Sequence, residues 1–150
     1  MSTLVVYFSR KGRTRRVAEA LAKRERADIW ELTTPERTGG WLGFWWCGRF
    51  AMHRWPMAVD PVGADVASYD KVIVCSPVWV FGACAPVWAF LRTYAGQVRA
   101  ADYVLVHFSL PMRYDRTAAA MDGALGVKHG RLLSVAAPWG RLWRYRLYDH

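Results

Sequence analysis

The sequence predicts an α/β domain in which a parallel sheet lies between layers of helices. Four apolar runs of strand length carry this prediction, at residues 3–8, 71–75, 103–108 and 131–137. Their residues are almost continuously apolar and do not alternate with polar ones, which is typical of strands covered on both faces. Helical patterns separate the runs, and this alternation of strand and helix favours a doubly wound domain.

A more polar run at 28–32 indicates an edge strand, so that five strands are expected. Three helices are predicted from apolar residues at three- and four-residue spacing: Val17, Ala18 and Leu21 after the first strand, Val87, Phe90, Leu91 and Tyr94 after the third, and Ala118, Met121 and Leu125 after the fourth. Pro86 lies where a helix would begin, and Gly96 lies where it would stop. We expect a single domain over residues 1–150.

The composition excludes several classes of protein. The chain has 150 residues, of which 53% are apolar, and this content excludes a disordered chain. Cys47, Cys75 and Cys84 form no CxxC pair, which argues against a disulfide framework or a zinc site and favours a reducing compartment. The N-terminus lacks the features of a secretory signal, and no apolar stretch reaches the roughly 18 residues of a membrane-spanning helix. We therefore expect a cytoplasmic protein.

A Trp-rich segment at 41–55 interrupts the alternation of strands and helices. It contains four of the nine tryptophans, and only Arg49, His53 and Arg54 within it are charged or ionisable. One interpretation is a crossover that packs on the sheet between the second and third strands. The other is an exposed basic element that contacts a membrane interface or an apolar partner. The sequence leaves both interpretations open.

The first strand ends in a turn that is suited to bind a phosphate group. Ser9, Gly12 and Thr14 follow the strand and lead directly into a helix. The N–H groups in the first turn of a helix have no intrahelical partner and lie at the positive end of its dipole. Gly12 lets the backbone curl around an oxyanion, and the two hydroxyls add donors. The spacing matches neither a Walker P-loop nor the GxGxxG fingerprint, which argues against ATP and against NAD bound in that manner.

A second segment, 76–82, follows the third strand with the sequence Ser-Pro-Val-Trp-Val-Phe-Gly. It is predicted to form a loop at the carboxyl edge of the sheet, where open parallel sheets bind ligands. Trp79 and Phe81 offer a flat apolar wall to a planar ring system. The phosphate turn and this wall are therefore expected at the same edge.

These segments resemble those of the flavodoxin-like family of FMN-binding proteins. Three stretches carry the resemblance: 5–21, with the phosphate turn and its helix; 69–79, which ends in Ser-Pro-Val-Trp; and 86–91, at the start of the following helix. The resemblance implies a three-layer sandwich with a five-stranded parallel sheet in the order 2-1-3-4-5 and helices on both faces. It also implies FMN as the cofactor.

The resemblance assigns the cofactor-binding residues one by one. The FMN phosphate would be held by Ser9, Arg10, Lys11, Gly12, Arg13 and Thr14. One face of the isoalloxazine ring would lie against Pro77, Val78, Trp79, Val80, Phe81 and Gly82. The segment 109–114 would cover the other face, with Ser109 and Tyr114 as its binding residues. For Tyr114, an ordinary position beside a helix is the alternative.

Two features depart from the pattern of the family. Arg10, Lys11 and Arg13 place three cations in a turn that usually relies on hydroxyls and amides, so these cations either strengthen phosphate binding or face a partner. After the fifth strand only residues 138–150 remain, so the family's closing helix is expected to be short. A short helix would leave apolar sheet surface uncovered for a second subunit. A homodimer is therefore kept as an alternative to a monomer.

The expected function is that of an FMN-binding electron-transfer protein. The sequence has no Ser-His-Asp, paired-carboxylate or HExxH pattern, so hydrolytic and metal-dependent mechanisms lack support. His107 lies inside an apolar strand and is expected to be a core or sheet-edge residue, not a catalytic acid or base. The alternative is a small FMN-dependent oxidoreductase, of the NAD(P)H:quinone reductase or porphyrinogen-oxidase type.

The formal net charge of +9 raises the question of nucleic-acid binding. Eight of the 21 Lys and Arg residues fall between positions 10 and 26, on the phosphate turn and the first helix. Aromatic residues are not interleaved with these cations, so a flavin-free nucleic-acid-binding module is only a minor alternative. The charge is instead expected to attract the anionic cofactor and redox partners with acidic docking surfaces.

Overall fold

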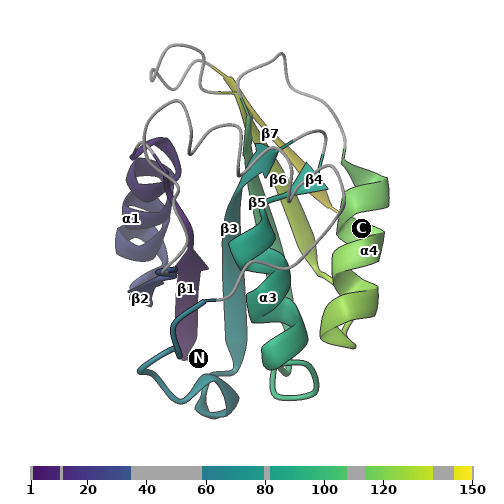
Figure 1. Ribbon diagram of the computed structural model, residues 1–150. Helices are drawn as coiled ribbons and strands as arrows, with labels where there is room; N and C mark the ends of the chain where they lie inside the picture. The colour runs from purple at the N-terminus through teal and green to yellow at the C-terminus, as the bar shows by residue number, and fades with distance from the viewer. Residues whose placement is uncertain are drawn as a thin grey trace.

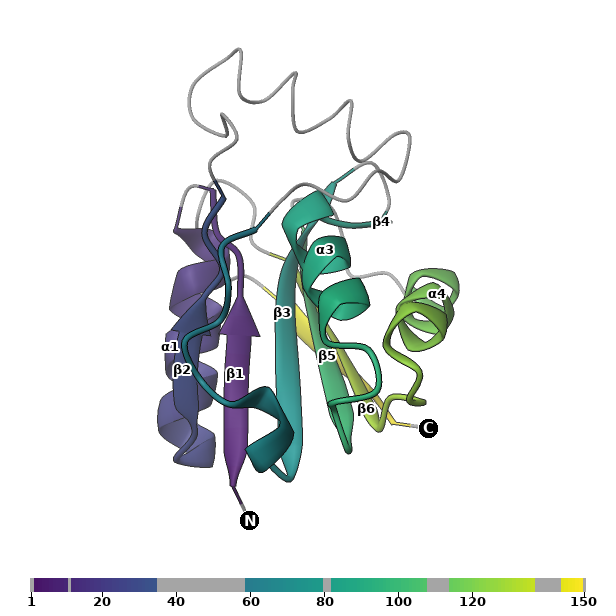
Figure 2. The same cartoon turned by 60° about the horizontal axis from the view of Figure 1, so that its bottom comes forward.

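The fold is a mainly parallel sheet with helices on both of its faces (Figures 1 and 2). The computed structural model describes residues 2–10, 12–34, 59–79, 82–107, 114–136 and 144–149. The elements are, in order, β1 (Thr3–Tyr7), α1 (Arg13–Glu25), β2 (Asp28–Glu31), the 3-10 helix η1 (Val66–Ser68), β3 (Lys71–Trp79), β4 (Gly82–Ala83), α3 (Ala85–Thr93), β5 (Ala101–His107), α4 (Asp115–Leu125), β6 (Arg131–Ala136) and β7 (Arg144–Asp149).

The strands of the sheet are ordered β2-β1-β3-β5-β6-β7. The first five of these are parallel, which confirms the predicted order of five parallel strands. The structure adds two antiparallel strands that the sequence analysis did not expect. The short β4 pairs with the end of β3, and β7 pairs with β6 along its whole length.

The chain after β6 corrects one expectation, because β7 is a strand where a short closing helix was predicted. Arg131 of β6 lies beside Asp149, and Ala136 lies beside Arg144. The sequence of β7, Arg-Tyr-Arg-Leu-Tyr-Asp, alternates in its first four residues between charged and apolar side chains. Alternation with a period of two is typical of a strand and does not supply the apolar stripe of a helix.

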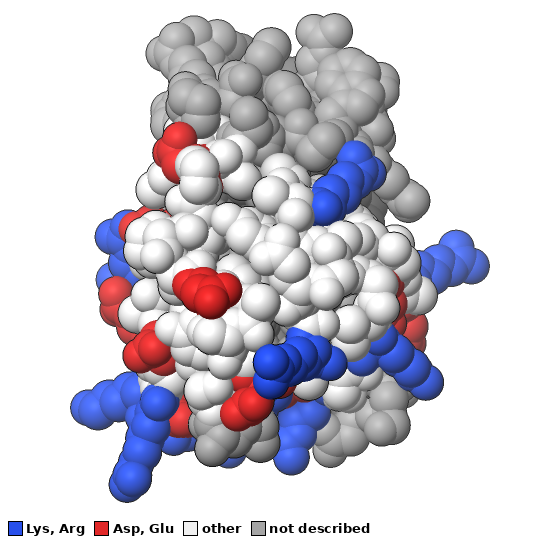
Figure 3. Space-filling model, turned by 90° about the horizontal axis from the view of Figure 1, so that it is seen from below, with Lys and Arg blue, Asp and Glu red and all other residues white. Residues whose placement is uncertain are grey.

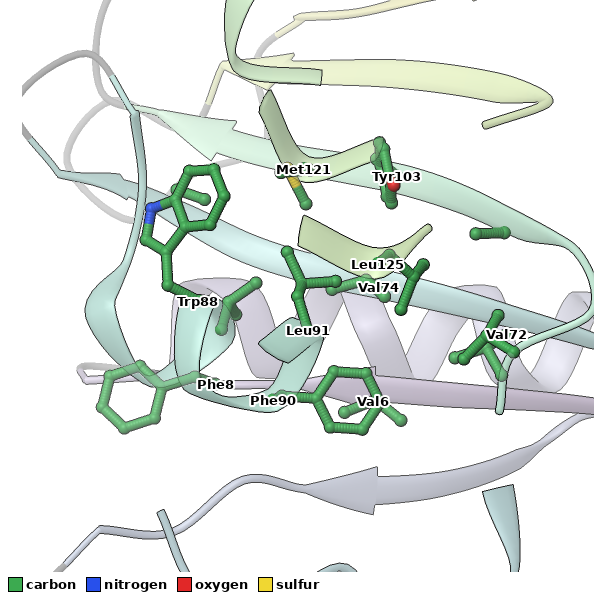
Figure 4. Packing of buried hydrophobic residues seen from close by; sticks show 14 of the residues in the cluster. Val6, Phe8, Val72, Val74, Trp88, Phe90, Leu91, Tyr103, Met121 and Leu125 are labelled. Atoms are coloured by element: carbon green, nitrogen blue, oxygen red, sulfur yellow. The ribbon is translucent and has the colours of Figure 1, made fainter. Parts of the chain in front are cut away.

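Alternate residues of the strands supply two apolar clusters, one on each face of the sheet. On one face, Leu4, Val6 and their neighbours pack with α3 and α4. Figure 4 shows this packing, with Phe90 and Leu91 of α3 and Met121 and Leu125 of α4 over the strands. On the other face, the cluster joins β1, β3, β5 and β6 to α1 through Val5, Tyr7, Ile73, Cys75, Val104, Val106, Val135, Val17, Ala18 and Ala22. Burial on both faces explains the near-continuous apolar runs of these strands.

The helix ends follow from local sequence. Pro86 lies in the first turn of α3, where its missing N–H has no intrahelical acceptor to lose. α4 ends at Gly126, which has a left-handed backbone with φ of 85°. Among the described helices, none is long and apolar enough to cross a lipid bilayer. The Trp-rich segment 41–55 lies outside the described residues, so both interpretations of it stay predictions.

Candidate functional site

The carboxyl ends of β1, β3 and β5 lie side by side at one edge of the sheet, the upper edge in Figure 1. Tyr7 at the end of β1 is paired with Cys75 of β3, and Pro77 of β3 is paired with Val106 of β5. The chain leaves β1 for β2 on one side and leaves β3 for β5 on the other. The edge between β1 and β3 is therefore a topological switch point, the position at which open α/β sheets bind ligands. We call it the carboxyl edge.

The predicted phosphate turn lies at this edge and opens α1. Gly12 precedes the helix with φ of 91°, in the left-handed region that favours glycine. The Ser9 hydroxyl accepts a hydrogen bond from the Gly12 N–H at 2.8 Å, which closes the turn. No acidic residue lies in the first turn of α1, and Gly12 provides no side-chain cap. N–H groups in the first turn of an α-helix have no acceptor within the helix, and the helix dipole favours an anion there.

The turn brings together five of the six residues predicted to hold a phosphate. Ser9, Arg10, Gly12 and Arg13 are half-buried, and Thr14 is buried with 2% of its surface exposed. Lys11 lies outside the described residues. Burial of Thr14 at the helix start fixes its position relative to the sheet, which is what a group that orients a ligand requires.

Sequence reasoning missed the group of side chains that anchors the start of α1. The Arg15 guanidinium donates to the Glu31 carboxylate at the end of β2 over 2.6 Å. This hydrogen bond, and a second with the Tyr7 hydroxyl, raise the pKa of Arg15 above its usual value. Burial raises the pKa of Tyr7. Because Glu31 already compensates Arg15, this cation is not part of the positive charge available to a ligand.

The predicted wall for a planar ring is a strand pair, where the sequence analysis expected a loop. β3 continues through Ser76 and Pro77 to Trp79, and β4 returns antiparallel beside it. Val78 is paired with Ala83, and Trp79 is paired with Gly82. Proline fits the extended backbone of a strand even though it lacks an N–H, which explains why this Pro-containing segment extends β3. The name edge hairpin is used below for β4 together with Val78 and Trp79, the residues of β3 that pair with it.

The residues predicted in this wall are only partly described. Pro77, Val78 and Gly82 are half-buried, and Trp79 belongs to β3 by its backbone. Val80 and Phe81 lie outside the described residues. Cys84 is fully buried at the start of α3. Cys75 is also buried, and its burial raises the pKa of its thiol to about 12.

The end of β5 brings His107 and Tyr114 together. His107 is buried, and its Nε2 lies 2.7 Å from the Ser134 hydroxyl on β6. Tyr114 precedes α4 and is 7% exposed, with its ring centroid 5.3 Å from that of His107. His107 is therefore the core residue that the sequence predicts. Ser109 lies outside the described residues, and stacking of Tyr114 on a ligand stays a prediction.

The arrangement can bind an anion at the start of α1, at the same edge of the sheet as an edge hairpin rich in apolar residues. Both elements lie at the switch point, since the end of β1 is hydrogen-bonded to β3 through the Phe8 N–H and the Cys75 carbonyl, 3.4 Å apart. Within the described residues, no group of three or more His, Cys, Asp or Glu side chains could hold a metal ion. The N–H groups, hydroxyls and apolar surface of the site can recognise an anionic group and an apolar ring.

No protein-family model matches the sequence, and no curated protein matches it. Solved structures do match, as the following three show. A protein from Bacteroides uniformis ATCC 8492, provisionally named a flavoprotein, is 21% identical over 90% of this chain and 91% of its own, with a TM-score of 0.74. A second, from Bacteroides eggerthii DSM 20697 and similarly named, is 20% identical over 87% of each chain, with a TM-score of 0.71. A flavoprotein from Lactobacillus acidophilus NCFM, solved in complex with FMN, is 17% identical over 90% of this chain and 91% of its own, with a TM-score of 0.65.

At these identities the likeness concerns the arrangement of the backbone. It extends over most of each chain and agrees with the order of the five parallel strands found here. The protein therefore has the flavodoxin-like fold.

Proposed function

We propose that this protein binds FMN at the carboxyl edge and acts as an electron-transfer protein. The observation that carries the proposal is the start of α1, which has a left-handed Gly12, no acidic residue in its first turn, and a position at the switch point, on the same edge of the sheet as the edge hairpin. The Lactobacillus acidophilus structure solved with FMN supports it, because that protein shares the fold over most of its length. Bound FMN would supply the redox chemistry by accepting and releasing electrons.

In this proposal, the phosphate of FMN lies at the start of α1. Its ligands are Ser9, Arg10, Lys11, Gly12, Arg13 and Thr14. The donors fit a phosphate, since the first-turn N–H groups, the hydroxyls and the cations supply hydrogen bonds and positive charge. The nearby carboxylate of Glu31 forms an ion pair with Arg15, and we expect this pairing to reduce its repulsion of the phosphate.

The isoalloxazine ring would lie on the edge hairpin, against Pro77, Val78, Trp79, Val80, Phe81 and Gly82. Ser109 and Tyr114 would border its other face. The ring of Tyr114 already packs beside His107, so Tyr114 would form the inner border of this face. Half-buried apolar residues of the hairpin would exclude water from one side of the ring and favour its stacking.

The partners proposed for electron transfer are redox proteins with acidic docking surfaces. The net charge of +9 would steer such partners toward the protein over long range, and added salt would slow their association. We also propose a cytoplasmic location, because the two cysteines in the described part of the chain, Cys75 and Cys84, are thiols outside any disulfide, as expected in a reducing compartment. Membrane contact through segment 41–55 and a homodimer are further proposals, to be tested by vesicle sedimentation and by light scattering.

The test of the cofactor is a titration of the purified protein with FMN and with riboflavin, followed by flavin absorbance and fluorescence. We expect FMN to bind more tightly than riboflavin, since only FMN carries the phosphate. A protein without a flavin band after incubation with FMN would contradict the proposal.

The test of the role is stopped-flow reduction of the FMN-loaded protein by NADH and by NADPH. Slow direct reduction is expected of an electron carrier, which receives its electrons from another protein. Rapid direct reduction would instead assign the protein to the FMN-dependent oxidoreductases.

A further inference from the structure

The side chain of Ser76 is a fully buried hydroxyl next to the edge hairpin. Ser76 is 0% exposed, and so are Cys84 and Ala85, while Ala83 is 1% exposed. Moving a hydroxyl out of water into such surroundings costs free energy unless hydrogen bonds replace those lost. A small apolar residue would avoid that cost, so the contacts of this hydroxyl indicate what it is needed for.

The hydroxyl of Ser76 joins groups on both sides of the hairpin. It donates to the Pro77 carbonyl at 2.9 Å and accepts from the Cys84 N–H at 3.0 Å. It also lies 3.4 Å from the Cys84 sulfur. Its donor and its acceptor are thus both engaged within the protein.

These contacts hold the base of the edge hairpin. Pro77 directly precedes Val78, the first residue of β3 that pairs with β4, and Cys84 directly follows Ala83, the last residue of β4. Cys84 also precedes α3, and its carbonyl accepts the first hydrogen bond of that helix, from Trp88 at 3.1 Å. One side chain therefore connects the sheet, the return strand and the start of α3.

We propose that Ser76 is a positioning residue for the flavin: its hydroxyl fixes the edge hairpin at the distance from the sheet that the isoalloxazine ring requires. The inference rests on the proposed function, and it concerns the ring half of the site alone. α3 is held independently by the buried side chains of Val87, Phe90 and Leu91. Loss of the hydroxyl is thus expected to release the hairpin while α3 keeps its place.

The experiment compares Ser76→Ala with the wild type in the full chain. The dissociation constants of FMN and riboflavin, the visible spectrum of the bound flavin and its midpoint potential are measured. We expect both dissociation constants to rise by the same factor, about tenfold, because the lost contacts act on the ring that the two ligands share. The spectrum and the potential are expected to shift as well. Ser76→Thr, which restores a hydroxyl, should recover most of the spectrum.

The matched control is Tyr103→Phe, which also removes a buried hydroxyl but at the opposite end of the sheet. It is expected to lower stability and to leave both dissociation constants, the spectrum and the potential unchanged. If Ser76→Ala does not fold, Ser76→Cys, which keeps a side chain of similar size with a weaker acceptor, is measured in the same way.

The outcomes separate this inference from the proposed function. A wild type that binds no FMN would defeat the proposed function. A wild type that binds FMN, together with a Ser76 variant of unchanged affinity and spectrum, would overturn the inference alone. A loss of affinity for FMN without a loss for riboflavin would also overturn it, because the effect would then lie in the phosphate turn.

Discussion

The two ends of the sheet differ in how their polar groups are satisfied. At the end where the parallel strands begin, carboxylates accept from donors within the protein. Asp122 accepts from the Tyr103 hydroxyl and the His129 ring, each at 2.8 Å, and from the His129 N–H at 3.0 Å. Asp102 accepts from the Arg131 N–H at 2.9 Å and pairs with Lys71. At the carboxyl edge, by contrast, the first turn of α1 has donors and no acidic residue.

This difference indicates which end of the sheet is suited to bind a ligand. Figure 3 views the first end and shows acidic and basic side chains interspersed over its described surface. At that end, the half-buried carboxylates of Asp102 and Asp122 each accept from donors within the protein. Among the described residues of the carboxyl edge, the first turn of α1 carries N–H donors and no acidic side chain, which favours an anion there. Substitutions at the first end should therefore change stability, whereas substitutions at the carboxyl edge should change ligand affinity.

The largest effect on stability is expected from Asp122→Ala. The substitution leaves the Tyr103 hydroxyl and two N–H groups of His129 without their acceptor in a largely buried position. We expect the free energy of unfolding in urea to fall by about 3 kcal/mol. The exposed Asp60, which accepts from Thr33, is the control, and Asp60→Ala should have a much smaller effect. If the folded Asp122→Ala protein bound FMN with a changed affinity, the two ends would not have separate roles in stability and in ligand binding.

A large effect on affinity is expected from Gly12→Asp, with Gly12→Asn as the matched control. Asp and Asn tolerate a left-handed backbone to a similar extent, and they differ in charge. A carboxylate at the start of α1 would compete with the phosphate for the first-turn N–H groups. We expect Gly12→Asp to bind FMN about tenfold or more weakly than Gly12→Asn. Riboflavin affinity should be equal in both variants, and equal FMN affinities would show that no phosphate binds there.

A smaller loss of stability is expected from Tyr103→Phe, which removes the hydrogen bond to Asp122 at the first end. Its cost should be about 1 kcal/mol near neutral pH, since one neutral donor is lost and Asp122 keeps its His129 donors. Chemical denaturation of the two proteins in parallel measures it. If Tyr103→Phe lowered the free energy of unfolding as much as Asp122→Ala does, the stabilising effect of Asp122 would come from its hydrogen bond with Tyr103 alone.

The same variant has a predictable pH dependence. Burial, and then the hydrogen bond to Asp122, raise the pKa of Tyr103 above its ordinary value of 10.0. Above pH 10 the unfolded chain therefore loses this proton while the folded chain keeps it, so wild-type stability falls as the pH rises. Tyr103→Phe lacks the group and should fall less steeply. The stability difference between the two proteins should thus shrink above pH 10, and a constant difference would contradict the assignment.

The smallest effect is expected from Arg15→Gln, compared with Arg13→Gln in the same helical turn. Arg15 is exposed and already paired with Glu31, so its loss should change FMN affinity by about twofold or less. Arg13 belongs to the proposed phosphate site, and Arg13→Gln should weaken FMN binding more. Titrations at low and moderate salt measure both. Equal losses would mean that the turn attracts the phosphate by its total charge, whichever arginine carries it.

Much of the sheet could be predicted from the sequence, because strands buried on both faces must be apolar throughout. The runs that became β1, β5 and β6 have nearly the predicted bounds. The edge strand β2 was also predicted, since its polar residues fit a strand with exposed side chains. The antiparallel β7 was missed because the resemblance to a family led to the expectation of a helix, although Arg144 to Leu147 alternate with a period of two.

The candidate site divides into a part that is local in the sequence and a part that is not. The turn that opens α1 was predictable, because Ser9, Gly12 and the start of α1 are neighbours in the chain; its binding of a phosphate stays a prediction. The contacts of Arg15 with Glu31 and of Ser76 with Cys84 join different elements. No periodic pattern marks such pairs, so only the three-dimensional structure reveals them. The extension of β3 through Pro77 was missed for a related reason. The end of β3 pairs with β4 only because the chain reverses its direction between them, and no local pattern in the sequence indicates that reversal.

The antiparallel direction of β7 determines where the ends of the chain emerge. Asp149 lies beside Arg131 at the start of β6, and Thr3 lies beside Lys71 at the start of β3. Both ends of the described chain therefore lie at the end of the sheet opposite the candidate cofactor site (Figure 2). A tag, a fused reporter or a linker to an electrode can thus be attached at either terminus while the site still faces the solution. Electrochemistry on protein immobilised through each end in turn should give the same midpoint potential.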